Sequence, residues 1–86
     1  MKIRLVGDAG DALGFSVAGI ESVVVGDRRE AERALAAVEA ETEVGLLLVS
    51  ASVDDLRPRA LERIRRRRGL PALVVLPAPA TGAPRP

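Results

Sequence analysis

The chain has 86 residues, 48% of them hydrophobic but only 1% aromatic, so we expect one small domain with an aliphatic core. It contains no cysteine and no histidine, which excludes disulfides, thiol catalysis, metal sites built from these residues and the commonest general base. Residues 1–50 have five basic and nine acidic groups and a net charge of −4, whereas residues 51–86 have eight basic and three acidic groups and a net charge of +5. The charge difference between the two halves suggests a polarised surface but is by itself no strong indication of nucleic-acid binding.

The first predicted elements are a strand and a short helix. Residues 2–6, KIRLV, alternate and end in valine, which predicts a strand followed by an acidic loop. We expect Asp11 to cap a helix over residues 12–18. Gly19 is placed to end this helix in the left-handed conformation.

A second strand and a longer helix follow. Residues 20–25, IESVVV, are β-branched and apolar, and Glu21 makes this strand the expected edge of the sheet. Residues 28–41 repeat apolar positions with a helical period. Asp27 precedes them and Glu30 lies three residues further on, which predicts an N-terminal capping box.

The second half of the chain predicts two strands around one helix. Residues 44–50, VGLLLVS, and residues 72–76, ALVVL, are almost wholly apolar, as in strands that are buried on both faces. Between them we expect a helix that begins at Asp54 or Asp55 and ends at Gly69.

The order of elements is therefore βαβαβαβ. It predicts an α/β domain over residues 1–77, with an open four-stranded parallel sheet, helices on both faces and a receiver- or flavodoxin-like topology. The first, third and fourth strands are expected to be central or sheltered. Residues 78–86 are expected to form a disordered proline-rich tail.

The loop after the first strand does not match known phosphate-binding motifs. Its glycines lack the Gly-x-Gly-x-x-Gly spacing, and no Gly-Lys-Ser/Thr sequence follows. Acidic residues at this position also occur in response-regulator receivers. Receivers need a phosphoacceptor aspartate at the end of the third strand, where this chain has Ser50, and a lysine after a later strand, whereas the only lysine here is Lys2.

The charged residues of the second half do not compose an enzyme site. Asp54 and Asp55 are interpreted as helix-capping residues rather than as an acid–base pair. Ser50 and Ser52 have no base to activate them. The run of arginines at 63 and 65–68 favours a solvated or protein-binding helix end, with Glu62 pairing to Arg66, over nucleic-acid binding, because aromatic rings for stacking are absent.

Residues 14–20, GFSVAGI, contain the only aromatic side chain, Phe15. They resemble the Gly-Phe-x-Leu-Ala-Gly-Leu/Ile signature of the F subunit of V-type (A/V-type) ATP synthases, with Val17 where leucine is usual. Further segments are similar to that family: Ile3 to Leu5 leading into Asp8, the helix 28–41, the strand 45–49 and the segment 68–77. Phe15 either fills the aliphatic core or faces a partner, and both readings stay open.

The resemblance implies a non-catalytic rotor subunit without cofactors. In this family the domain binds the D subunit of the central stalk, ATP chemistry occurs on the A and B subunits, and the F subunit modulates the coupling to ion translocation. We accordingly expect a cytoplasmic protein that reaches the membrane only through the complex, and no nucleic-acid partner. The expected partner-binding residues are Asp8, Gly14, Phe15, Ala18, Gly19, Arg63, Arg66 and Arg67.

The family usually continues into a C-terminal helix, which the prolines at positions 77, 79, 84 and 86 disfavour here. We therefore expect docking through the globular domain rather than regulation by an extending helix. The alternative is a stand-alone, receiver-shaped interaction module that is not phosphorylated.

Overall fold

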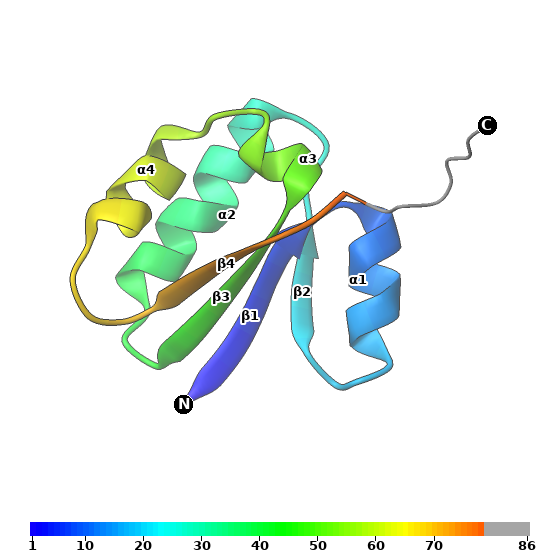
Figure 1. Cartoon of the computed structure of the whole chain (residues 1–86), viewed down its shortest axis with the longest axis horizontal. Helices are drawn as coiled ribbons and strands as arrows, with labels where there is room; N and C mark the ends of the chain where they lie inside the picture. The colour runs from blue at the N-terminus through cyan, green and yellow to red at the C-terminus, as the bar shows by residue number, and fades with distance from the viewer. Residues whose placement is uncertain (79–86) are drawn as a thin grey trace.

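The computed structural model describes residues 1–78, which form a four-stranded parallel sheet with helices against both faces (Figure 1). Its elements are β1 (Lys2–Gly7), α1 (Ala9–Ser16), β2 (Glu21–Val24), α2 (Arg28–Ala40), β3 (Val44–Ser50), α3 (Ala51–Asp54), α4 (Arg59–Arg66) and β4 (Ala72–Leu76). The strand order is β2-β1-β3-β4, so β2 and β4 are the edges. The predicted fold class is confirmed. Positions 79–86 of the predicted tail lie outside the described residues, and the domain boundary stays a prediction.

The larger core lies between the sheet and the pair of helices α2 and α4. Side chains alternate between the two faces of a strand, and on this face aliphatic residues of β1, β3 and β4 meet those of both helices. The fully buried members of this core include Val6, Leu35, Leu47, Leu61 and Ile64. Asp27 begins α2 as predicted, because its side chain accepts a hydrogen bond from the N–H of Glu30 at 2.8 Å.

The smaller core lies between the sheet and α1. Leu5 of β1, Ala12 of α1 and Leu48 of β3 form its buried centre. Phe15 is half-buried and packs against this cluster, so the ring fills the aliphatic core as the first of the two readings expected. The ring therefore fixes how α1 lies on the sheet.

Helix α1 begins three residues earlier than predicted. Asp8, not Asp11, is the N-cap: its backbone is extended, and its side chain accepts a hydrogen bond from the N–H of Asp11 at 2.9 Å. Two aspartates spaced by three residues both fit the capping pattern, and the earlier one is the N-cap. Gly19 has the predicted left-handed backbone, with φ of 79°.

The predicted helix beginning at Asp54 or Asp55 is wrong, because two shorter helices occupy this segment. Asp54 ends α3, and the chain turns through Arg57, whose φ is +52°. Pro58 then precedes α4 as its N-cap. The break has a physical cause: a proline disfavours helical backbone at the residue before it. Helix α4 ends at Arg66, three residues before the left-handed Gly69.

Strand β4 is less sheltered than its apolar sequence predicts. It is an edge strand, paired only with β3, and no residue in it is fully buried. The side chain of Val74 is 45% exposed. Strand β2 is the other edge, as expected from Glu21. An apolar run bounded by prolines therefore did not distinguish a central strand from an exposed edge.

Candidate functional site

A polar cluster of Asp8, Asp11, Ser50 and Ser52 lies where β1 and β3 end. The Ser50 side chain is fully buried; its hydroxyl donates to Asp11 Oδ2 at 2.6 Å and accepts from the N–H of Asp8 at 3.1 Å. Ser52 donates to Asp8 Oδ2 at 2.8 Å. A Cβ at Gly7 would collide with Ser50 Oγ, so this approach requires glycine.

These contacts give the polar cluster a structural role. Hydrogen bonds from the N–H of Asp11 and the hydroxyl of Ser52 lower the pKa of Asp8 below its ordinary value. Within residues 1–78, no group of three or more Asp, Glu, His or Cys side chains is placed to hold a metal ion. The cluster connects the N-terminus of α1 to the end of β3, and Ser50 occupies the position where a receiver has its phosphoacceptor.

The outward face of α1, continued by Val17 and Ala18 just after the helix, is mostly apolar and lacks charge. Leu13 is 72% exposed and Val17 is 86% exposed. Gly14 and Ala18 lie beside them and are also exposed. Gly14 has no positive φ, and a Cβ built on it would meet nothing within 4 Å. The fold of the domain therefore does not require this glycine, although glycine lowers helix stability.

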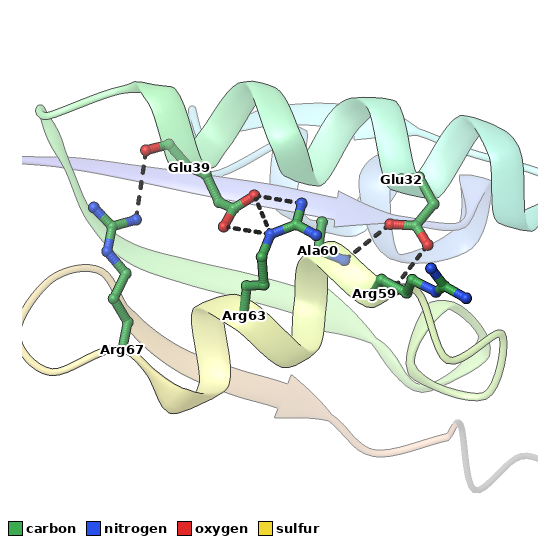
Figure 2. A network of polar contacts seen from close by, with 6 residues as sticks. All are labelled: Glu32, Glu39, Arg59, Ala60, Arg63 and Arg67. Carbon is green, nitrogen blue, oxygen red and sulfur yellow. Dashed lines mark hydrogen bonds and ion pairs between the residues drawn. The ribbon is translucent and has the colours of Figure 1, made fainter.

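On the other side of the sheet, two glutamates of α2 hold α4 (Figure 2). Glu32 accepts hydrogen bonds from the N–H groups of Arg59 at 2.6 Å and Ala60 at 2.9 Å, which lower its pKa. Glu39 forms a two-pronged ion pair with Arg63, with distances of 2.8 and 3.1 Å. The ion pair raises the pKa of Arg63. Arg63, a predicted partner-binding residue, thus forms its ion pair within the domain.

The arginines at the end of α4 are more accessible. Arg66, Arg67 and Arg68 are exposed, and within residues 1–78 none forms an ion pair with a carboxylate. Arg67 makes only a long hydrogen bond of 3.4 Å to the carbonyl oxygen of Glu39 (Figure 2). These three side chains form a basic helix end that is available to an acidic neighbour.

Arg65 is the exception in this run. It pairs with Asp54 at 3.0 Å and with Glu62 at 2.6 Å, so the predicted pairing of Glu62 with Arg66 is wrong. The pair with Asp54 connects α3 to α4 across an open pocket. The residues lining this pocket are Asp54, Asp55, Arg57, Pro58, Leu61, Glu62 and Arg65. Ion pairs within the pocket compensate several of its charges.

The predicted contact residues fall on two sides of the sheet and do not form one site. On the α1 side lie Asp8, Gly14, Phe15, Ala18 and Gly19, and on the α4 side lie Arg63, Arg66 and Arg67. Sequence reasoning missed Leu13 and Val17. Leu13 and Val17 are four residues apart, which places them on one face of a helix and away from the inward-facing Ala12. This spacing was the signal that could have identified them.

The comparison with protein families identifies the family of the chain. The model of the ATP synthase (F/14-kDa) subunit family matches residues 3–85. The chain belongs to this family. The match covers nearly the whole chain, and it confirms the resemblance that GFSVAGI suggested.

A solved structure supports the fold of this family member. The chain is similar to the crystal structure of the F subunit of the V-type ATP synthase from Archaeoglobus fulgidus, with 24% sequence identity and a TM-score of 0.74. The match covers 88% of this chain and 96% of the archaeal one. No curated protein sequence matches the chain. At this identity the structural match supports the fold, and the family assignment rests on the family model.

Proposed function

We propose that this chain is the non-catalytic F subunit of the central stalk of a V-type ATP synthase or ATPase. In this role it binds the D subunit of the rotor and helps to couple ATP hydrolysis or synthesis to ion translocation. Membership in the ATP synthase F subunit family supports the assignment to such a complex. Exposed side chains on the α1 side of the sheet and at the end of α4 support a role through contacts with other subunits.

The observation that carries this proposal is the outward face of α1. Leu13 and Val17 are largely exposed, and no charged side chain occurs on the helix after Asp11. Exposed apolar residues that gather on one face mark interaction sites. Gly14 and Ala18 allow a second backbone to approach closely, as packing against a long helix of the D subunit requires. Phe15 holds α1 in place from below.

The basic helix end is proposed as a second contact, for acidic groups of neighbouring ATPase subunits. Helix α4, which ends at Arg66, packs on the side of the sheet opposite to α1, so the two surfaces serve different neighbours. Within residues 1–78, no helix has the length and apolarity needed to cross a membrane. We propose a cytoplasmic location, at the membrane only through the complex.

The experiment is co-purification with the D subunit of the same ATPase. We expect the wild-type chain to be retained by the tagged D subunit, and Leu13→Lys and Val17→Lys to be retained at least about fivefold less, since central interface residues contribute more than about 1 kcal/mol. Ala37→Lys, on the exposed side of α2, is the matched control and should bind as the wild type. Retention of neither wild type nor control would refute the assignment.

A further inference from the structure

The two edges of the sheet are protected to different degrees. Strand β2 carries Glu21, which pairs with Arg4 of β1 at 3.0 Å. Strand β4 has five residues, ALVVL, without any charge, and its outer edge has no neighbouring strand among the described residues. Natural proteins usually place charges on edge strands to prevent pairing with another chain. Strand β4 lacks this charge protection, and its short apolar edge between two prolines stays open to a strand of matching length.

The sequence around β4 favours a self-complementary pairing. Pro71 and Pro77 bracket the strand, and proline donates no backbone hydrogen bond, so an added strand is limited to residues 72–76. A second β4 in antiparallel orientation, centred on Val74, pairs all five residues. Ala72 then faces Leu76, and Leu73 faces Val75, with each pair on one face of the sheet. Every contact in this register is apolar.

The charges near the two ends of β4 are complementary in the same orientation. The basic helix end, Arg66–Arg68, precedes the N-terminus of β4 (Figure 1). The other end of β4 is opposite Ser50, where α3 begins and brings the exposed Asp55, beside Asp54, which is paired with Arg65. Antiparallel pairing places the basic end of each copy beside the acidic end of the other. A parallel arrangement would place like charges together.

We propose that the isolated chain forms a two-fold symmetric dimer through antiparallel pairing of β4, which joins two sheets into one of eight strands. A two-fold interface uses the same patch on both copies, and β4 meets this requirement in sequence and in charge. The contact is short, so the dimer is a weak, concentration-dependent one at the small end of the range for specific interfaces. This inference is independent of the proposed binding of the D subunit.

The first test is a single-cysteine cross-link, which is clean because the chain has no cysteine. In the proposed register the two Val74 residues are opposite each other, with Cα atoms about 4.5–5.5 Å apart, within disulfide range. We expect Val74→Cys to form a disulfide dimer under mild oxidation with copper–phenanthroline. Val24→Cys, on the other edge strand, is the matched control and should stay monomeric, although Val24 is 55% exposed.

The second test is sedimentation of the full chain at concentrations from about 10 µM to 1 mM. The wild-type protein should shift from monomer to dimer, Val74→Lys should shift the midpoint at least about tenfold upward, and Val24→Lys should not. A wild-type chain that is monomeric throughout, or a dimer that Val74→Lys leaves unchanged, overturns the proposal. A disulfide dimer of the Val24→Cys protein, with none formed by Val74→Cys, overturns it too. None of these outcomes affects retention by the D subunit.

Discussion

The carboxylate of Glu32 caps helix α4 at Ala60, although the two residues are 28 positions apart in the chain. Pro58, the residue at the N-cap position, has no side-chain acceptor. A glutamate of α2 therefore accepts the hydrogen bonds that an N-cap side chain would otherwise accept. The first turn of α4 depends on packing against α2, because the carboxylate arrives only when the two helices are docked. This coupling makes α4 a sensitive probe of the fold.

Replacing Glu32 by Ala should remove this cap. The N–H groups of Arg59 and Ala60 then lose their acceptor, and we expect the free energy of unfolding to fall by about 0.5–2 kcal/mol, as for other lost caps. Glu32→Gln keeps one acceptor oxygen and should lose less. Urea denaturation followed by circular dichroism measures both. Equal stability of all three proteins would show that Glu32 does not cap α4 in solution.

The same contact predicts a pH dependence. Its hydrogen bonds to the N–H groups of Ala60 and Arg59 lower the pKa of Glu32 in the folded state below the ordinary value of 4.5. The unfolded chain therefore binds the proton first as the pH falls. The stability that Glu32 supplies is complete above pH 4.5 and is lost as the pH drops through the lower, folded pKa. The difference in the free energy of unfolding between wild type and Glu32→Gln, measured from about pH 7 to pH 3, should shrink as the pH falls below 4.5. A constant difference speaks against the effect.

Ser50 should contribute more to stability than its neighbour Ser52. Ser50→Ala leaves the part-buried N–H of Asp8 without its acceptor, which costs about 1–3 kcal/mol. Ser52 is exposed and makes one hydrogen bond, so Ser52→Ala should cost less than about 1 kcal/mol. Thermal unfolding of the two variants compares them directly. The reverse ranking would mean that the polar cluster does not hold α1 as described.

Gly14→Ala should separate stability from binding. A Cβ at this position meets nothing, and alanine favours a helix over glycine by up to about 1 kcal/mol, so the isolated domain should become more stable. Binding to the D subunit should weaken, because the added methyl group keeps the partner helix further away. Ala37→Gly on α2 is the control with the opposite effect on stability and none on binding. A Gly14→Ala protein that binds more tightly contradicts close approach at α1.

Local signals predicted much of this fold, and tertiary contacts explain the rest. Asp27 and Glu30 identify the start of α2 within the sequence itself, and Gly19 marks the turn into β2. The cap that Glu32 provides comes from another helix, so no local pattern encodes it. Arg57 before Pro58 was a readable signal for the break between α3 and α4. The exposure of Val74 depends on the order of the strands in the sheet, and an apolar run of residues does not reveal this order.

For the candidate surfaces, sequence reasoning found residue types but not their directions. Gly14 and Ala18 were expected at a partner surface, and both are exposed, Gly14 on α1 and Ala18 in the turn after it. Arg63 was expected there as well, yet Glu39 engages it inside the domain. The distinction arises from the way α4 packs on α2, which places Arg63 against Glu39 and leaves Arg66 at the exposed end.

We propose that the chain works by being held against the D subunit through α1. Hydrogen–deuterium exchange of the chain, alone and with a saturating amount of the D subunit, tests it most directly. We predict slower exchange over residues 9–18 in the complex and unchanged exchange in the middle of α2. The absence of any protection, or protection restricted to α2 and α4, would contradict docking through α1.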